Sequence, residues 1–417
     1  MIDIQLIREH LDLVKKGLTK KQSNPELAVD AFKLDKEKRR LQTEVEAFQS
    51  NLNQVSKEIA KEFGQKKVDL LKQANQISEQ IDKHRPHLDA LEKDLNEVMA
   101  QIPNMPLDDV IAGHSDKDNK VAYKKGDVPK FGFTVKDHIQ LAADLDLIEF
   151  DAAAKSMGSR FAYLKNELVV LEFALMRYGL DQAMKSGFKP ILPPILLNRA
   201  AMDAAGYLGQ AEEEIYKTQD DLYLAGTAEQ PLLALHAGQM LKKEDLPLRY
   251  VGFSSCFRRE AGSYGKDVKG ILRMHQFQKL ELFSFVEPEM AEQEHKKILE
   301  LEEKLMASLD IPYQVIDICA GDLGFPAAKK WDIEAWMAGQ NTYRETHSCS
   351  NCTDFQARRM NIRYKDEKGT RFVYTLNGTV FSERPLIAIL ENNQQKDGSI
   401  KVPKVLAPYT GFDVIKK

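Results

Sequence analysis

Two long heptad repeats, in residues 34–63 and 68–102, constrain the fold of this chain more than any other feature. Apolar side chains recur there in alternating steps of three and four, which places them along one seam of a helix. Gly64 lies between the repeats and marks a reversal of the chain. Two helices of about thirty residues, at ~1.5 Å per residue, predict an antiparallel hairpin that projects roughly 45–50 Å. The seam positions are Leu41, Val45, Phe48, Leu52, Val55 and Ile59, followed by Ala74, Ile77, Ile81, His84, Leu88, Leu91, Leu95, Val98 and Ile102.

The hairpin has too little core to be a catalytic domain, so by default it is a spacer or a dimerisation rod. Residues 31–100 hold thirteen basic and thirteen acidic side chains, so charge does not decide between a rod and an RNA-binding lever. Two irregularities interrupt the second helix. His84 occupies a seam position, and Pro86 is expected to kink the helix or open it locally.

Length and composition allow two domains and a large core in 417 residues. The 59 basic and 63 acidic residues give a net charge of −4, which argues against indiscriminate adhesion to nucleic acid or membranes. No apolar run approaches the ~18–20 residues of a membrane helix. The N-terminal sequence lacks signal and transit patterns, and four cysteines fit a reducing compartment. We expect a soluble cytoplasmic protein without a membrane partner.

The chain divides by composition into three parts. Residues 1–105 form the N-terminal domain, with the helical arm at about 29–102. Residues 106–130 gain Pro, Gly and Asp and are interpreted as a linker. Residues 131–417 mix helices with hairpin-linked strands, which predicts an antiparallel α+β domain rather than a doubly wound one. The sequence contains no Walker lysine loop or GxGxxG motif, so a nucleotide would be held in another way.

Residues 257–281, FRREAGSYGKDVKGILRMHQFQKLE, are interpreted as two strands joined by a long loop. Side chains on a strand alternate between its faces. Arg258 and Glu260 therefore share one face, and Phe257 and Arg259 the other. On the second strand Arg273, Phe277 and Glu281 are expected to lie together. Arginine, an aromatic ring and carboxylates suit a ligand with phosphates, a flat base and an amine. The alternative is an ordinary solvated sheet face.

This stretch resembles the second signature motif of the seryl-tRNA synthetase family, a group of class II aminoacyl-tRNA synthetases. GFKPILPPILLNRAAM (187–202) is similar to the first motif, and TLNGTVFSERPLIAILENNQQ (375–395) to the third. YLAGTAEQPL (223–232) and NTYRETHSCSNCTDFQARR (341–359) are similar to serine- and ATP-site segments. The resemblance runs from residue 1 to about 417. It implies an antiparallel class II catalytic sheet flanked by helices, with the coiled coil as a tRNA-binding arm.

The resemblance implies a two-step reaction in which serine and ATP, with Mg²⁺, give seryl-adenylate, and the seryl group then passes to the 3′ end of the serine tRNA. Whether the selenocysteine tRNA is also served stays open. Neither step needs a protein nucleophile, because positioning and neutralisation of charge on phosphate suffice. A homodimer with the first motif at its interface is also implied.

Site residues are carried over from the family motifs. Arg258 is implied to contact the α-phosphate, Glu260 the adenine edge, and Phe277 the adenine face. Arg258, Arg384 and Glu345 are the implied catalytic residues, and Glu345 and Ser348 the Mg²⁺ ligands. The whole ATP set is Arg258, Arg259, Glu260, Arg273, Met274, Phe277, Glu345, Thr346, His347, Ser348 and Arg384. The serine set is Thr227, Ala228, Glu229, Glu281, Asn377 and Thr379, and the tRNA patch on the arm is Lys36, Lys38, Arg39 and Arg40.

Cys349 and Cys352, with His347, offer three metal ligands, but structural zinc needs four, usually as two separated pairs. Free thiols are therefore expected and a zinc site is not. Two positions depart from the family pattern. Arg259 replaces a small residue, and Glu383 replaces glycine beside Arg384, where it is a candidate competitor of phosphate for that arginine.

Two alternative functions stay open. An amino acid–carrier protein ligase uses the same adenylating core, although such relatives lack the long arm. A catalytically inactive interaction protein is the second alternative; the presence of Arg258, Glu260, Glu281 and Arg384 counts against it.

Overall fold

The computed structural model describes residues 1–208, 212–261, 267 and 269–417. Residues 262–266 and 268 of the loop expected between the two strands of segment 257–281 therefore lie outside the described residues. The chain divides into two compact units, Met1–Met105 and Pro106–Lys417. In the described part of the chain, none of the helices combines the length and the apolar character needed to cross a bilayer.

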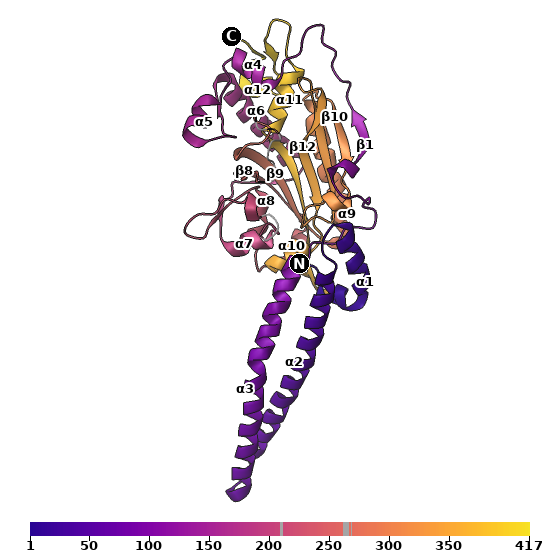
Figure 1. Ribbon diagram of the computed structural model, residues 1–417, viewed down its shortest axis with the longest axis vertical. Coiled ribbons are helices and arrows are strands. Elements are labelled where there is room, and N and C mark those ends of the chain that lie inside the picture. Colours follow the sequence, from indigo (N-terminus) through magenta and orange to yellow (C-terminus); the bar gives the residue numbers. More distant parts are fainter. Residues whose placement is uncertain (209–211, 262–266, 268) are drawn as a thin grey trace. The chain divides into compact units, whose positions relative to one another are not determined.

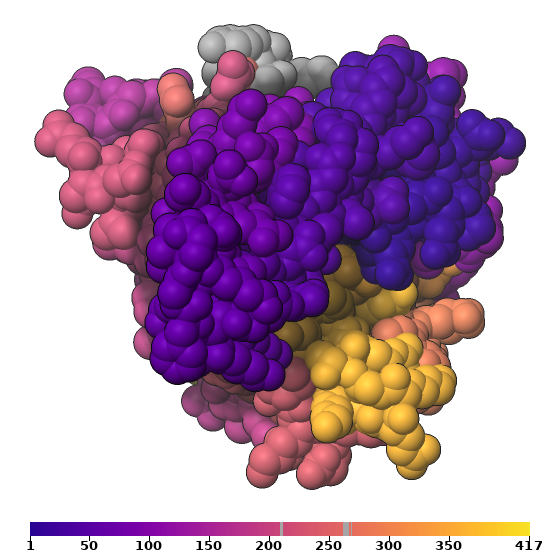
Figure 2. Space-filling view, turned by 90° about the horizontal axis from the view of Figure 1, so that it is seen from below, coloured from indigo at the N-terminus to yellow at the C-terminus, as the bar shows by residue number. Residues whose placement is uncertain are grey.

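The first unit is the predicted helical hairpin with one further helix. It contains α1 (Ile4–Lys20), α2 (Glu26–Ile59) and α3 (Gly64–Gln101), and the last two lie side by side along their length (Figure 1). Leu41 and Val55 of α2 and Leu91 and Leu95 of α3 are buried, as the heptads require. Figure 2 looks along this unit from the end where the two helices join, and shows its closely packed side chains in indigo to purple.

The two irregularities of α3 have different outcomes. His84 stacks on Phe48 of α2, with ring centroids 5.9 Å apart and planes 8° from parallel. His84 therefore fits the seam because its flat ring packs against the flat ring of Phe48. α3 continues through the exposed Pro86 as one helix, so Pro86 does not divide it.

An antiparallel-dominated sheet organises the second unit (Figure 1). Neighbouring strands run antiparallel, except for the parallel pair β4 and β8 at one edge. This confirms the predicted α+β class. In sheet order the described strands are β1 (Lys120–Lys125), β10 (Tyr313–Asp317), β11 (Lys329–Met337), β12 (Thr342–Asn351), β15 (Tyr374–Ser382), β9 (Gln276–Val286), β8 (Leu248–Phe257) and β4 (Lys189–Ile191).

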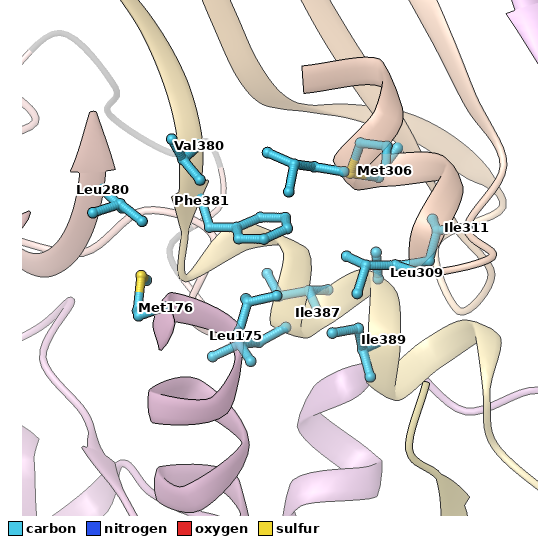
Figure 3. Packing of buried hydrophobic residues seen from close by; sticks show 14 of the residues in the cluster. Leu175, Met176, Leu280, Met306, Leu309, Ile311, Val380, Phe381, Ile387 and Ile389 are labelled. Atoms are coloured by element: carbon cyan, nitrogen blue, oxygen red, sulfur yellow. The ribbon is translucent and has the colours of Figure 1, made fainter. Parts of the chain in front are cut away.

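Three long helices pack on this sheet and form the main core. They are α6 (Asn166–Lys185), α9 (Ala291–Ser308) and α11 (Arg384–Asn392). Figure 3 shows Leu175 of α6, Met306 of α9 and Ile387 of α11 gathered around Phe381 of β15. Burial of such apolar side chains contributes roughly 1.5–3 kcal/mol each, so this core fixes the ends of β9 and β15.

A second, smaller core includes Leu232, Phe283, Phe285 and Ala357. The shorter helices are α4 (His138–Asp144), α5 (Asp151–Met157), α7 (Arg199–Ala204), α8 (Glu229–Ala234), α10 (Phe355–Met360) and α12 (Ala407–Thr410). The short strands are β2 (Ile148–Glu149), β3 (Tyr163–Leu164), β5 (Leu196–Leu197), β6 (Tyr223–Leu224), β7 (Met240–Lys242), β13 (Arg363–Asp366), β14 (Gly369–Phe372), β16 (Ile400–Lys401) and β17 (Val414–Ile415).

The segment 106–130 carries regular structure that its interpretation as a linker did not anticipate. β1 (Lys120–Lys125) pairs antiparallel with β10 at the edge of the main sheet. Its six residues are all exposed, so the strand has no buried face whose alternation would reveal it in the sequence. The segment thus adds a strand to the main sheet.

Candidate active site

A cleft with two connected lobes opens over β8, β9, β12 and β15. The lobes hold about 610 Å³ and 1780 Å³ of empty space, the open mouth included. That is ample for a nucleotide and a small amino acid together. Residues that line both lobes are Arg258, Glu260, Arg273, Lys279, Glu345, Ser348 and Arg384.

The first lobe combines an aromatic ring with cationic groups. The guanidinium carbon of Arg258 lies 5.3 Å from the centre of the Phe277 ring. Arg258 Nε also donates a hydrogen bond to the carbonyl oxygen of Gly226 at 3.1 Å. Both contacts fix the plane of the guanidinium and leave its remaining N–H groups for a ligand. Met274 and Ser382 line the same lobe.

Arg273 is held at the mouth of the cleft by two carboxylates. Its Nη1 lies 3.2 Å from Glu260 Oε2, and its Nε lies 3.2 Å from Asp267 Oδ2. Arg344 pairs with the same carboxylate of Asp267. Glu260 has a left-handed backbone, with φ 52°, directly after the end of β8. This turn aims the Glu260 side chain into the cleft although the strand has ended.

Arg384 and Glu345 form the opposite wall. Arg384 Nη1 lies 3.1 Å from Glu345 Oε2 and donates to the backbone oxygen of Glu345 at 3.0 Å. Burial opposes ionisation of Glu345, but the charges of Arg384 and Lys330 outweigh it and lower its pKa to about 2. Glu345 is therefore an anion at neutral pH. α11 begins at Arg384 with Pro385 in its first turn, so the arginine lies at a positive helix end.

Glu383 does not compete for Arg384, which corrects that expectation. Its Oε1 accepts a hydrogen bond from the backbone N–H of Gln278 at 3.0 Å, and its carboxyl group is electrostatically coupled to that of Glu172 of α6. Burial raises the pKa of Glu383 to about 8 and that of Glu172 to about 7. Two buried carboxyls in contact share a proton, so Glu383 carries little charge to offer the arginine.

The second lobe contains a buried carboxylate, Glu229, in a rigid setting. Tyr207 Oη donates to Glu229 Oε2 at 3.0 Å, and Gln356 Nε2 donates to Glu229 Oε1 at 2.6 Å. Gln356 is itself oriented by Thr375, whose hydroxyl donates to Gln356 Oε1 at 2.7 Å. Burial raises the pKa of Glu229. This network points a preorganised anion at the cleft, which suits an ammonium group.

A second carboxylate, Glu281 of β9, lies beside it. Thr227 Oγ1 donates to Glu281 Oε2 at 3.2 Å, and the buried ammonium group of Lys279 pairs with the same oxygen. Burial raises the pKa of Glu281 to about 6, against the opposing effect of Lys279. Across the strands, Glu281 pairs in register with Thr379 of β15. Glu281 and Thr379 therefore present their side chains on the same side of the sheet.

Most residues predicted for the site line this cleft, and three do not. Arg259 is exposed and contributes its backbone N–H to the oxygen of Glu214. His347 is buried, with Nε2 3.0 Å from the Val380 oxygen, and burial lowers its pKa to about 4. Ala228 is fully buried. Residues that do line it include Thr227, Glu229, Glu281, Asn377, Thr379, Thr346 and Ser348.

The segment TAE (227–229) does not form a strand. β6 ends at Leu224, and α8 begins at Glu229, so Thr227 and Glu229 reach the cleft from a turn and a helix start. A helix forms here rather than a strand because Leu232 and Leu233, one turn later, are buried in the second, smaller core.

The side chains of Cys349 and Cys352 lie in different surroundings, and only Cys352 lines the cleft. Cys349 Sγ lies 3.6 Å from the backbone oxygen of His295, whereas Cys352 lines the second lobe and accepts from Asn377 Nδ2 at 3.9 Å. All four cysteines of the chain are free thiols. Within the described residues, no group of three His, Cys, Asp or Glu side chains has the arrangement of a metal site.

The basic patch on the arm is largely paired within the arm. Lys38 lies 3.1 Å from Glu92, and Arg40 lies 2.7 Å from Glu37 and 2.5 Å from Glu44. Arg39 joins Arg8 of α1 in holding the buried Asp35, at 2.9 Å and 2.6 Å. Arg39 thus serves the packing of α1 on α2, which the sequence did not predict. Lys36 is exposed.

Several residues of the site were missed in the sequence. Lys279 follows the same period of two as Phe277 and Glu281, so strand alternation alone could have included it. Tyr207, Gln356 and Glu172 carry no such signal, because they belong to elements far away in the chain.

Family models match both units of the chain. Residues 1–106 match the model described as the seryl-tRNA synthetase N-terminal domain. Residues 213–393 match the tRNA synthetase class II core domain (G, H, P, S and T).

Individual relatives match over the full length. A serine–tRNA ligase of Dictyoglomus turgidum is 44% identical over 422 residues, covering 100% of this chain and 99% of that protein. The crystal structure of seryl-tRNA synthetase from Pyrococcus horikoshii complexed with ATP has a TM-score of 0.95 and 40% identity, with 100% of this chain and 99% of that one covered. Cytoplasmic serine–tRNA ligase from Naegleria fowleri in complex with AMP has a TM-score of 0.90 and 32% identity, with the same coverage.

Proposed function

The chain belongs to the seryl-tRNA synthetase family, and from this premise we infer how its own residues activate serine and charge tRNA. The protein is an aminoacyl-tRNA ligase that uses ATP. The observation that carries the assignment of roles is the convergence of Arg258, Arg273 and Arg384 with Phe277 in one lobe, next to Glu229 and Glu281 in the other.

In the ATP lobe, the adenine would stack on Phe277 between that ring and the surrounding apolar wall. Arg258, whose plane is already fixed, would neutralise charge on the α-phosphate as serine attacks it. Arg273 and Arg384 would exchange their carboxylate partners for the distal phosphates, since phosphate oxygens offer the same two-pronged geometry. These roles follow the family motifs and are supported by the positions of the side chains around the cleft.

In the serine lobe, Glu229 would hold the ammonium group and Glu281 with Thr379 the hydroxyl group. Lys279 already neutralises Glu281 in the described structure. Because Lys279 balances the charge of Glu281, the neutral hydroxyl group of serine would bind there without leaving an unpaired buried charge. Thr227 and Asn377 would complete the walls of this lobe.

A Mg²⁺ ion with ATP fits the donor set, because the Glu345 carboxylate is ionised and Ser348 adds a hydroxyl oxygen on the same wall. The ion would neutralise phosphate charge when bound. Glu345, released by Arg384, would then hold the ion.

Partners and organisation extend the proposal. The arm (29–102) would contact the long stem of the serine tRNA through shape, phosphates and 2′-hydroxyls, with Lys36, Lys38, Arg39 and Arg40 as the proposed patch. Residues 131–417 would form the catalytic domain. The buried, free thiols are consistent with a cytoplasmic location.

A homodimer is proposed through the first motif and the helix before it. Leu192 is 79% exposed and Phe173 of α6 is 65% exposed, while Leu196 and Val170 are exposed nearby in sequence. Large apolar side chains in such positions indicate an interface.

The direct test is charging of total tRNA with labelled serine in the presence of ATP and Mg²⁺. Acid-precipitable label confined to the serine tRNA is the expected result. Serine-dependent pyrophosphate exchange without any tRNA charging would favour the carrier protein ligase instead. Absence of both activities in a folded protein would support the inactive alternative.

A further inference from the structure

The backbone of β15 is irregular where the strand passes between the two lobes, since Asn377 lines the serine lobe and Thr379 the ATP lobe. Pairing with β12 reaches Gly378, opposite Cys349, and the register with β9 shifts between Thr379 and Phe381. The backbone N–H of Thr379 donates instead to a side chain, Glu302 Oε1 of α9, at 2.7 Å. A carboxyl group from a helix therefore supplies the hydrogen bond that a neighbouring strand would otherwise provide.

The approach of Glu302 depends on the glycine beside Thr379. A Cβ atom on Gly378 would lie 2.8 Å from Glu302 Oε1 and 2.3 Å from Cγ2 of Ile298, also on α9. Real side chains do not tolerate such distances. Gly378 thus lets α9 lie close enough to β15 for the contact to form, and no room is left behind Thr379.

Glu302 is completely buried, and no described residue forms a hydrogen bond with its Oε2. Burial raises the pKa of Glu302 well above the ordinary value, and the nearby Glu281 and Asp332 carboxylates act in the same direction. The neutral form of Glu302 is therefore favoured more than that of an exposed carboxyl group. Its contribution to Thr379 is that of a hydrogen-bond acceptor, which an amide would provide equally well.

We propose that Glu302 is a positioning residue that sets the hydroxyl end of the serine pocket and so helps the site to select serine over threonine. The inference rests on the proposed function of the cleft. Thr379 lies directly across from Glu281, and the two form the pocket end in which one additional methyl group must be refused. A pocket rejects a single methyl group only if its walls cannot yield.

The physical argument concerns the N–H of Thr379. If Glu302 is lost, a buried donor is left unsatisfied unless the backbone shifts to find another acceptor. A shift of Thr379 would enlarge the hydroxyl end of the pocket. Among these described side chains, no hydrogen bond or ion pair joins Glu302 to Arg258, Phe277 or Arg384. These phosphate and adenine contacts would therefore keep their geometry, although Thr379 also lines the ATP lobe.

The test compares Glu302→Leu, which removes the acceptor, with Glu302→Gln, which keeps it. In pyrophosphate exchange, we expect Glu302→Leu to raise the KM for serine about 10-fold or more and to lower the serine-to-threonine preference by a similar factor. The KM for ATP should change less than about 2-fold. Glu302→Gln should stay close to the unchanged enzyme, and Gly378→Ala should resemble Glu302→Leu.

Glu294→Gln is the matched control. Glu294 is a second buried carboxylate of α9, but it pairs with Arg249 at 2.6 Å and accepts from Ser284 at 2.8 Å, away from Thr379. This variant should lower the melting temperature and leave the serine KM unchanged. If Glu302→Leu does not fold, Glu302→Ala takes its place.

Three results would overturn the proposal: an unchanged serine KM in the folded Glu302→Leu or Glu302→Ala variant, an equal rise of both KM values, or equal damage in Glu302→Gln. Failure of the proposed function is distinguishable, because the unchanged enzyme would then show no serine-dependent exchange.

Discussion

At the residue scale, the cleft works through side chains that are oriented before any ligand arrives. Arg258 is fixed by the Phe277 ring and the Gly226 oxygen, and Glu229 by Tyr207 and Gln356. Preorganised charges of this kind contribute more to a transition state than mobile ones, because no reorganisation is needed during the reaction.

Arg258→Ala should reduce serine-dependent pyrophosphate exchange by about 10²-fold or more, because the charge aimed at the α-phosphate is removed. Arg259→Ala is the control, since its side chain is exposed and does not line the cleft. Near-normal exchange by a folded Arg258→Ala variant would exclude the assigned role.

The buried pair Glu383 and Glu172 leads to a prediction about how protein stability depends on pH. Burial raises the pKa of Glu383 from 4.5 to about 8 and that of Glu172 to about 7, so the folded state keeps protons that the unfolded state releases. Stability should therefore fall as pH rises from about 4.5 to 8. Glu383→Gln retains an acceptor for the Gln278 N–H and removes one titrating group.

The measurement is the free energy of unfolding in urea, followed from about pH 5 to about pH 8.5 so that it spans the titration of the pair. Glu383→Gln should flatten the fall and be more stable than the unchanged protein at the alkaline end. An identical slope in both proteins would mean that the pair does not titrate in this range.

Some residues of the site could be predicted from the sequence, and others could not. Arg258, Glu281 and Arg384 lie in motifs that resemble those of the seryl-tRNA synthetase family, so their presence in one cleft could be predicted from that resemblance. Glu302 and Glu172 could not, because each acts on a residue far away in the chain and only the packing of α9 or α6 on the sheet creates the contact. Their buried carboxyls look like ordinary polar helix residues in the sequence.

At the scale of elements, the helices of the arm were predicted from the sequence, whereas one strand of the sheet was not. The heptads predicted α2 and α3, because a continuous seam leaves one solution for two adjacent helices. The edge strand β1 was hidden, since an exposed strand has no burial pattern. The charge count of the arm was correct but did not reveal that Arg39 is used to hold Asp35.

Deleting residues 31–100 and joining the ends with a short flexible linker should separate the two steps. Serine-dependent pyrophosphate exchange should stay within a few-fold of normal, because the cleft lies entirely within residues 206–384. Charging of serine tRNA should be lost. Normal charging by the shortened protein would show that the arm is only a rod.

At the scale of the whole molecule, the exposed apolar side chains of the first motif predict self-association. Phe173→Glu combined with Leu192→Glu should convert a dimer to a monomer in sedimentation velocity, since two charges would be buried without partners. Met157→Glu, which alters another exposed apolar residue, should leave the assembly unchanged. A monomeric unchanged protein would contradict the proposed dimer.

The ion pairs that line the cleft, Lys279 with Glu281 and Arg384 with Glu345, have a consequence for every molecule that enters. Each charge in these pairs already has a partner of opposite sign, so a ligand that displaces one partner must supply its replacement. At the buried pair of Lys279 and Glu281, an amine alone or a carboxylate alone would leave one of the original partners unpaired in a poorly hydrated place. Such a site rejects a compound that matches only half of its charges, whether or not that compound has the right shape.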